Sequence, residues 1–310
     1  MIRIITFIIV YILGVISSHS QITSENVIIH NNNIVLPGTL TYNSSYKQPL
    51  IIFVPGSGNP NRDGNQPSLN INPNYIKQLS DKLVQHQIAF FRYDKRNVPK
   101  ENIQLVLKKY LFTDLVEDAS AVINYFKNDN RFSEIILIGH SQGSLVSMLA
   151  LNKQVSKFIS LAGLGESVDK TLVRQISQQN EALGTIAKKH IVELKSTGTI
   201  QKINPFLISL FAKQNHPFLV SYMKYDPKKE VQKIAIPTLI INGTKDLQVL
   251  TKDAQNLHLA NPQSKLVLIN GMNHVLKQIE EDSDNLKSYT TPDFPISEEL
   301  TKSIITFVKQ

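Results

Sequence analysis

The sequence contains no cysteine among its 310 residues. Without thiols the chain cannot form disulfide bonds, use a thiolate nucleophile or hold a metal through sulfur. This absence fits a reducing or an oxidising compartment equally well. The spacing His-x-x-x-His and aspartate-rich calcium loops are absent too, and the acidic stretch EEDSDN near residue 280 is expected to be a solvated loop. We therefore expect no metal site and no cofactor.

Long basic runs are missing as well. The chain carries 33 Lys and Arg against 25 Asp and Glu, which gives a formal net charge of +8, but no basic run exceeds two residues. Because no nucleic-acid-reading motif accompanies this charge, we expect no nucleic-acid partner. An apolar content of 42% and a charged content of 19% are ordinary for a globular protein that can bury a full core.

One apolar run stands at the amino terminus. Arg3 precedes apolar residues 4–16, and small polar residues follow up to Gln21. The run is too short to span a bilayer as a helix, which needs about 20 residues, and the pattern is typical of a secretory signal. We predict a signal peptide over residues 1–20, cleaved near Ser20 and Gln21, and an exported protein that is periplasmic or secreted. An uncleaved membrane anchor is the alternative, and the one membrane contact we expect.

The rest of the chain alternates strand and helix patterns. Residues 25–42 predict two antiparallel strands that meet at an asparagine-rich turn. Apolar runs predict further strands at residues 49–56, 88–94, 135–138, 156–163, 236–246 and 264–274. Helical spacing of apolar residues appears at residues 72–87, 112–129, 253–259 and 296–309, and directly after Ser141. The alternation predicts an α/β fold with a mainly parallel, doubly wound sheet and helices on both faces.

One stretch breaks this alternation. Between about residues 165 and 234 the sequence is polar and helical, with no convincing strand pattern. We predict a helical lid inserted between two parts of one α/β core, residues 21–164 and 235–310, above the carboxyl ends of the strands. An independent helical domain is the alternative. The apolar residues of this stretch are expected to pack the lid, or else to line an acyl pocket: Phe206, Leu207, Phe211, Phe218 and Tyr222.

A serine lies at a strand-to-helix corner. The motif Gly139-x-Ser141-x-Gly143 follows a buried strand pattern and precedes a helical one. This setting is typical of a nucleophile elbow, in which glycines let the strand and the helix pass closely while the serine hydroxyl stays exposed. The alternative is a tight connection whose serine only caps the helix.

A nucleophilic serine needs a base, and the base needs an orienting carboxylate. In this type of corner both follow later strands, in the order acid and then histidine. Asp246 and His274 end the last two strand patterns, so we predict Ser141 as nucleophile, His274 as general base and Asp246 as its orienter. A turn aspartate and an ordinary loop histidine are the alternatives. Asp253 is a weaker substitute inside a helix pattern, and His140 is expected to pack behind the turn.

The negative oxygen that develops during acyl transfer needs main-chain N–H donors. One donor should come from Gln142, the residue after the serine. The other should come from the glycine-rich loop after the strand at residues 49–56, where Ser57 is the first choice and Gly58 the alternative.

Together, the pieces GHSQGS, VPGSGNPNRDGN, FRYDKRN, INGTKDLQV and GMNHVLK resemble the α/β-hydrolase superfamily. They are most similar to bacterial esterases, secreted or cytoplasmic, with dienelactone-hydrolase-like or serine-aminopeptidase-like domains. The resemblance runs from about Pro49 to the carboxyl terminus without the insertion, and it implies the same triad and amide-donor roles. It also implies that residues 61–65 and Asp94 shape the mouth of the site, with a salt-bridged or turn-capping role as the alternative. Asn97 stands where such proteins usually have glycine, so no substrate contact is assigned there.

The sequence therefore predicts a secreted serine hydrolase that cleaves carboxylic esters of small molecules through an acyl-enzyme. An amidase or peptidase with the same triad is the alternative, and a non-catalytic binding protein is a further one. The acyl-chain preference and the oligomeric state are not predicted.

Overall fold

The computed structural model describes residues 21–310, and the predicted signal segment lies outside the described residues. The described chain opens with two antiparallel strands, β1 (Ile22–Asn31) and β2 (Ile34–Asn43). They are joined at Asn32, whose φ of 52° lies in the left-handed region that asparagine tolerates better than most residues. The predicted hairpin is confirmed.

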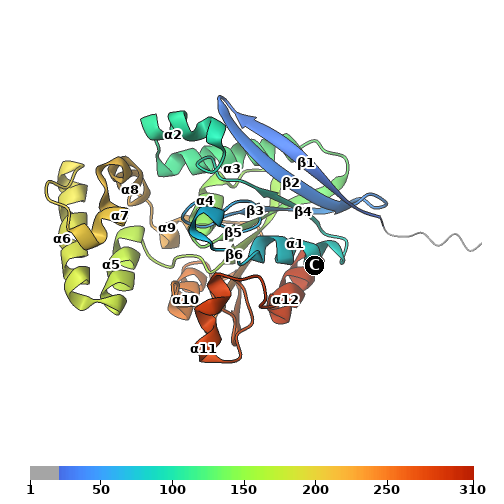
Figure 1. Cartoon of the computed structure of the whole chain (residues 1–310). Helices are drawn as coiled ribbons and strands as arrows, with labels where there is room; N and C mark the ends of the chain where they lie inside the picture. Colours follow the sequence, from blue (N-terminus) through green and yellow to red (C-terminus); the bar gives the residue numbers. More distant parts are fainter. Residues whose placement is uncertain (1–20) are drawn as a thin grey trace, which may run out of the picture.

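The sheet has eight strands in the order β1-β2-β4-β3-β5-β6-β7-β8 (Figure 1). β2 pairs antiparallel with β4, and all later pairs are parallel. The strands after the hairpin are β3 (Gln48–Val54), β4 (Ala89–Tyr93), β5 (Phe132–His140), β6 (Val155–Leu161), β7 (Thr238–Gly243) and β8 (Lys265–Ile269). The predicted mainly parallel α/β sheet is confirmed, and its strand carboxyl ends share one edge.

Two layers of helices cover the sheet (Figure 1). On one face lie α1 (Tyr75–Val84) and α12 (Glu298–Val308), and on the other lie α3 (Phe112–Phe126), α4 (Gln142–Ala150) and α10 (Thr251–Ala260). Neighbouring residues of a strand point to opposite faces, so Ile51 of β3 packs toward α1 and Ile52 packs toward α3. The helices pack against the sheet through apolar stripes, such as the one that contains Leu79 and Leu83 of α1.

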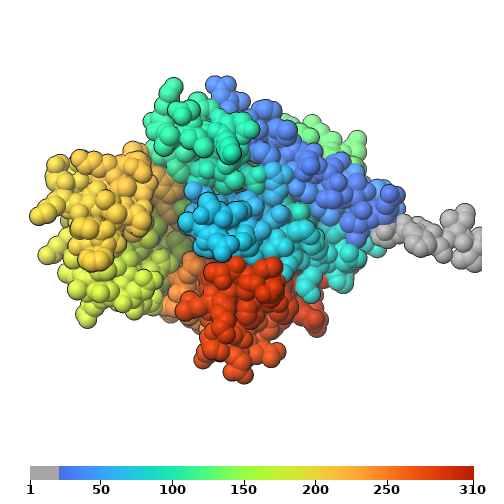
Figure 2. Space-filling view, viewed as in Figure 1, coloured from blue at the N-terminus to red at the C-terminus, as the bar shows by residue number. Residues whose placement is uncertain are grey.

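Between β6 and β7 the described chain forms helices and no strand. We name α5–α9 the inserted helices: α5 (Val168–Gln179), α6 (Glu181–Thr197), α7 (Ile208–Phe211), α8 (His216–Tyr222) and α9 (Pro227–Val231). α5 to α8 share a small apolar core of their own, which includes Ala187, Leu194 and Phe211. In the space-filling view the yellow and yellow-green part of the chain forms a lobe beside the sheet-bearing body (Figure 2).

Aromatic contacts join this lobe to α3 and to Tyr110, which lies just before α3. The ring centroids of Phe112 and Tyr222 are 4.1 Å apart in a stacked pair, and those of Tyr110 and Phe218 are 4.7 Å apart. Aromatic pairs of this kind add about 0.5–1.5 kcal/mol beyond the area they bury. The Phe112 amide also donates to the Ser221 hydroxyl at 2.8 Å. The inserted helices are therefore docked on the core by side-chain contacts in addition to their two chain connections.

Three details differ from the sequence predictions. Phe206 is 82% exposed, so the expectation that it packs the insertion is wrong. The helix α2 (Ile103–Lys108) was missed. Near residue 280 the expected solvated loop contains the short helix α11 (Asp282–Asn285), and Asn285 is buried. Within residues 21–310 no helix is both long enough and apolar enough to cross a bilayer.

Candidate active site

Ser141 stands at the corner between β5 and α4. Its φ of 54° and ψ of −121° are rare for a residue with a side chain, and such strain costs on the order of 1–3 kcal/mol. The corner is tight: a Cβ on Gly139 would lie 2.4 Å from the carbonyl oxygen of Gly143, and a Cβ on Gly143 would lie 2.2 Å from that of Val54. The Ser141 amide donates to the Leu161 carbonyl at 2.8 Å. This is the local geometry of a nucleophile elbow.

Asp246 and His274 meet at the same edge of the sheet. Asp246 follows β7 and His274 follows β8, and both side chains are buried. The Nδ1 atom of His274 lies 2.8 Å from the Oδ2 atom of Asp246. An imidazole that donates from Nδ1 to a carboxylate leaves Nε2 unprotonated and able to accept a proton. The structure thus brings the predicted acid and the predicted base together.

The Asp246 carboxylate is itself held in place. Its Oδ1 atom accepts hydrogen bonds from the amides of Gln248 and Val249, each at 2.8 Å, while Oδ2 faces the imidazole. Asp253, the alternative to Asp246 in the sequence analysis, has a different partner, because it accepts a hydrogen bond from the Arg174 guanidinium at 2.8 Å. Asp253 therefore ties α10 to the inserted helices, and Asp246 is the carboxylate beside the histidine.

His140 does more than pack behind the turn. Its Nε2 atom lies 2.8 Å from the main-chain oxygen of His274, and its Nδ1 atom lies 3.2 Å from the Tyr75 hydroxyl. Because a carbonyl can only accept, Nε2 carries the hydrogen and Nδ1 accepts from the tyrosine. Burial, assisted by the nearby His274 imidazole, lowers the pKa of His140 to about 3, so this ring stays neutral. His140 therefore holds the main chain of His274 in place through this hydrogen bond.

A cluster of hydrogen-bonded polar residues around Asn273 stabilises the turn that carries His274. The amide group of Asn273 donates to Asn285 Oδ1 at 3.0 Å and to Ser288 Oγ at 2.7 Å, and its oxygen accepts from the Lys277 amide at 3.0 Å. Asn285 belongs to α11 (Asp282–Asn285) and Ser288 follows it closely. The segment expected to be a solvated loop therefore holds the predicted base, His274, in position.

Ser141 and His274 border one cavity. In the described part of the chain the His274 ring is hydrogen-bonded to Asp246, and no hydrogen bond joins it to the Ser141 hydroxyl. Catalytic hydrogen bonds of this kind are often long in the free enzyme and tighten once substrate is bound. The geometry therefore places the two groups at one cavity without fixing their contact.

The predicted amide donors lie beside the serine. Gln142 is the first residue of α4, where helix geometry leaves the amide without an intrahelical acceptor. Among residues 21–310 no protein acceptor faces the amides of Gln142, Ser57 or the alternative Gly58. The loop runs close by, because a Cβ added to Gly56 would lie 3.1 Å from the Ser141 Cβ. These amides are available to an oxygen bound above Ser141.

This chain is similar in sequence to known proteins. A family model described as serine aminopeptidase, S33, matches residues 73–209, which include the serine corner. Esterase EstD of Thermotoga maritima is 24% identical over 253 residues, which are 78% of this chain and 58% of EstD. The chain thus spans less than two thirds of that relative's length.

Solved structures extend the comparison to the whole fold. Est1E from Butyrivibrio proteoclasticus matches with a TM-score of 0.57 at 17% identity, over 92% of this chain and 99% of Est1E. The α/β hydrolase GrgF from Penicillium sp. sh18 matches with a TM-score of 0.60 at 16% identity, over 93% of this chain and 98% of GrgF. The chain therefore has the α/β-hydrolase fold.

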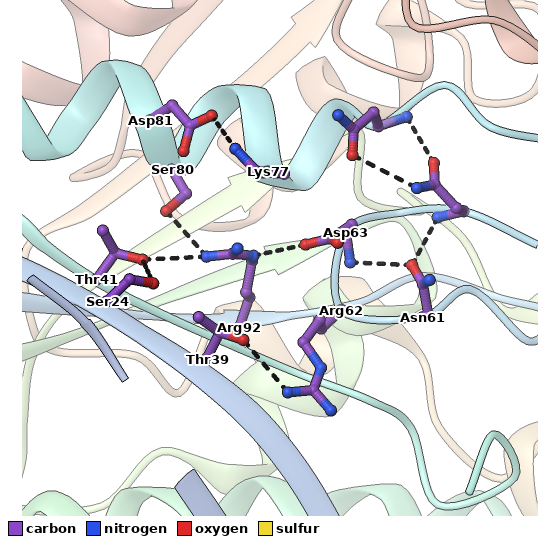
Figure 3. A network of polar contacts seen from close by, with 12 residues as sticks. Ser24, Thr39, Thr41, Asn61, Arg62, Asp63, Lys77, Ser80, Asp81 and Arg92 are labelled. Atoms are coloured by element: carbon purple, nitrogen blue, oxygen red, sulfur yellow. Dashed lines mark hydrogen bonds and ion pairs between the residues drawn. The ribbon is translucent and has the colours of Figure 1, made fainter. Parts of the chain in front are cut away.

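Two arginines tie the loop at residues 61–65 to β4 and the residue after it. Arg92 donates from Nε to Asp63 at 2.8 Å (Figure 3), and Arg62 pairs with Asp94 at 2.6 Å. The Arg62 amide also donates to Asp94 at 2.7 Å. Asp94 therefore has the salt-bridged role that the sequence left as the alternative, and it anchors the loop that follows Ser57.

Two cavities open on Ser141. The smaller, of about 250 Å³, lies toward the His274 turn, and the larger, of about 540 Å³, lies beneath the inserted helices. Ser57, Ser141 and Gln248 border both cavities, whereas His274 borders the smaller and Gln142 the larger. Within residues 21–310 no group of three or more His, Asp or Glu residues is placed to hold a metal ion.

Three contributors to this candidate site were not predicted from the sequence. Tyr75, Asn285 and Lys95 are each assigned a site contact only by the structure. Tyr75 lay in a helix pattern as an apolar residue, and Asn285 lay in a polar stretch. Lys95 belonged to the quoted piece FRYDKRN, and its position next to Asp94 was the one signal in the sequence that pointed to it.

Proposed function

We propose that this protein is a serine hydrolase that cleaves carboxylic esters, with Ser141 as nucleophile, His274 as general base and Asp246 as the residue that orients the base. One observation carries the proposal. The buried His274–Asp246 hydrogen bond of 2.8 Å borders the same cavity as a serine held in a strained elbow. Strain kept at a side chain that faces a cavity is a feature of functional sites.

The proposed reaction has two halves. Ser141 Oγ attacks the ester carbonyl while His274 Nε2 takes its proton, and the amides of Ser57 and Gln142 stabilise the oxyanion. His274 then gives that proton to the leaving alcohol oxygen as the C–O bond breaks, which leaves an acyl-serine. A water molecule loses a proton to His274 and attacks the acyl carbon. The acid leaves, and the proton returns to Ser141.

The two cavities suggest which part of an ester lies where. The leaving alcohol must be next to His274, because this imidazole protonates it. His274 borders the cavity of about 250 Å³, so we assign the alcohol to that cavity. The acyl group then extends past Gln142 into the cavity of about 540 Å³, whose walls include Leu172, Phe218 and Leu219 of the inserted helices. Polar residues such as Asn97, Thr171 and Gln175 line this cavity too, so the proposed substrates are esters of a bulky acid with both apolar and polar parts.

The names of related proteins support this chemistry. EstD is named an esterase, and a structure of Est1E with bound ferulic acid matches this chain with a TM-score of 0.58 at 19% identity. The family model carries the name serine aminopeptidase, which favours amide cleavage as the second candidate. The same triad can serve both reactions.

Covalent labelling tests the enzyme class. A fluorophosphonate probe should label the wild-type protein on Ser141, and Ser141→Ala should remove both the label and the ester hydrolysis. Ser144→Ala is a matched control, because Ser144 is a buried serine of α4 whose hydroxyl bonds to Ser160 at 2.7 Å. Labelling that persists in Ser141→Ala would contradict the proposal.

A substrate panel then separates the two candidates. Esters and aminoacyl amides with the same acyl group should differ, with esters cleaved faster and a burst of alcohol before the steady state. Amides cleaved faster than the matched esters would favour the peptidase.

We also propose that the chain is exported and that its mature form begins at Gln21. The Gln21 carbonyl accepts from the Ser44 amide at 3.2 Å, and β1 begins at Ile22, so cleavage after Ser20 leaves the hairpin complete. Amino-terminal sequencing of the protein from a fractionated culture tests this. Recovery of the full-length chain in the cytoplasm would contradict it.

A further inference from the structure

Lys95 is a buried lysine that points at the loop of the proposed oxyanion site. It follows β4, and the residue as a whole is 4% exposed. Its Nζ atom donates to the carbonyl oxygen of Gly56 at 2.9 Å and to that of Gly58 at 3.1 Å. The side-chain oxygen of Gln142 is a third acceptor, at 3.4 Å. Three acceptors match the three hydrogens of an ammonium group.

The first of these acceptors belongs to the peptide unit that carries a proposed catalytic donor. The Gly56 carbonyl and the Ser57 N–H share one planar unit, and in a trans peptide they point in opposite directions. A hydrogen bond from Lys95 to the Gly56 oxygen therefore fixes where the Ser57 N–H points. It also polarises the unit, since hydrogen bonds in series strengthen one another, so that the N–H becomes a better donor.

The third acceptor reaches the other proposed donor. Gln142 contributes its main-chain N–H to the site, and its side-chain oxygen faces Lys95 Nζ. One ammonium group thus contacts the glycine-rich loop after β3 and the first residue of α4. Those two segments must keep a constant separation if both amides are to meet one oxygen atom. Lys95 lies where it can set that separation.

Burial of this lysine needs a reason, because a buried charge without a counter-charge is unfavourable. In the described part of the chain no carboxylate forms a salt bridge with Lys95, and the nearby Asp118 is taken by Arg96 at 2.7 Å. Burial lowers the pKa of Lys95 to about 7, and the Asp118 charge opposes that shift. The lysine therefore costs stability at this position. Its three acceptors all belong to the loop and the helix that present the amides.

We propose that Lys95 is a positioning residue for ester hydrolysis, which orients the Ser57 and Gln142 amides toward the oxyanion and adds positive charge behind them. The inference rests on the proposed function. It predicts an effect on the transition state, where the oxygen is negative, and little effect on binding of the neutral ester.

The test is Lys95→Met, which keeps the length of the side chain and removes the donors. We expect kcat to fall about 10- to 100-fold, which is less than the ~10²–10³-fold loss expected for removal of an oxyanion donor itself. KM should change much less than kcat, because Lys95 borders the larger cavity but donates its hydrogens to protein oxygens rather than to the substrate. Inhibition by a boronic acid, which forms a negatively charged tetrahedral adduct on Ser141, should weaken by the same factor as kcat/KM.

Lys157→Met is the matched control. Lys157 is a half-buried lysine that also donates to a main-chain oxygen, that of Val308, at 2.7 Å, but it lies near the amino end of β6, away from the site. It should keep the wild-type kcat. If Lys95→Met folds poorly, Lys95→Gln provides a shorter neutral donor, and its kcat should lie between those of Lys95→Met and the wild type.

The outcomes separate the two levels of the argument. Hydrolysis that survives in Ser141→Ala would overturn the proposed function. A folded Lys95→Met protein with the wild-type kcat and boronic acid affinity, alongside an inactive Ser141→Ala, would overturn only the role of Lys95. A change confined to the melting temperature would do the same, because it would make the lysine a structural tie.

Discussion

The imidazole of His140 is hydrogen-bonded to the main-chain oxygen of His274, 134 residues further along the chain, at 2.8 Å. The residue before the proposed nucleophile thus supports the backbone of the proposed base. The two rings lie 4.8 Å apart between centroids, and Tyr75 completes the chain of hydrogen bonds from the other side. This contact couples the serine corner to the histidine turn without using the reactive atoms of either.

The first prediction follows from that contact. His140→Phe keeps an aromatic ring of similar size but leaves the His274 oxygen and the Tyr75 hydroxyl without their partner. We expect kcat to fall roughly 5- to 10-fold, and the free energy of unfolding to fall by about 1–3 kcal/mol, because buried groups lose hydrogen bonds. Steady-state kinetics and urea unfolding measure the two effects. Tyr75→Phe removes only the hydroxyl and should have a smaller effect on kcat, whereas equal losses would contradict a direct link through His140.

The second prediction concerns pH. Burial lowers the pKa of His140 from 6.5 to about 3 in the folded protein. Between these two values the unfolded chain binds more protons at this residue than the folded chain does. The contribution of His140 to stability therefore rises with pH through this window and is constant above it. The groups that face the ring are the Tyr75 hydroxyl and His274, which is paired with Asp246.

Urea unfolding at several pH values tests this. The free energy of unfolding of the wild type should increase more steeply between pH 4 and pH 6 than that of His140→Phe, which does not titrate at this position. Carboxylates contribute equally to both proteins, so the difference between the two slopes isolates His140. Parallel slopes would mean that the imidazole is protonated in the folded state.

The third prediction concerns the orienting carboxylate. Asp246→Asn keeps the shape of the side chain, but the amide no longer favours the imidazole tautomer with an unprotonated Nε2. We expect kcat to fall by about 10⁴-fold with KM little changed, as for the same change in a serine protease with a Ser-His-Asp triad. Asp253→Asn is the control, because Asp253 pairs with Arg174 and should affect the melting temperature rather than kcat. A normal rate in Asp246→Asn would remove Asp246 from the triad.

The parts of the site that the sequence predicted are those with local signals. Ser141, Asp246 and His274 each follow an apolar strand pattern, and parallel strands bring their carboxyl ends to one edge, so the fold places these residues together. The role of His140 had no such local signal, because the main-chain oxygen that it binds belongs to His274, which is 134 residues further along the chain. Lys95 and Asn285 are polar residues whose burial depends on how loops pack. Phe206 shows the reverse case, since an apolar residue in a helical stretch lies on the surface.

The last prediction tests the assignment of the two cavities. Leu172 of α5 borders only the larger of the two cavities, and Thr290 borders only the smaller. A larger side chain at either position therefore narrows one cavity and leaves the other unchanged. Leu172→Trp should lower kcat/KM for long-chain acyl esters about 10-fold relative to acetate esters of the same alcohol, since excess volume in a packed pocket is costly. Thr290→Trp should leave that ratio unchanged and discriminate against bulky alcohols instead. Two series of esters, one varied in the acid and one in the alcohol, measure both effects. If the two variants exchange their selectivities, the acyl group occupies the cavity next to His274 and the leaving group lies beneath the inserted helices.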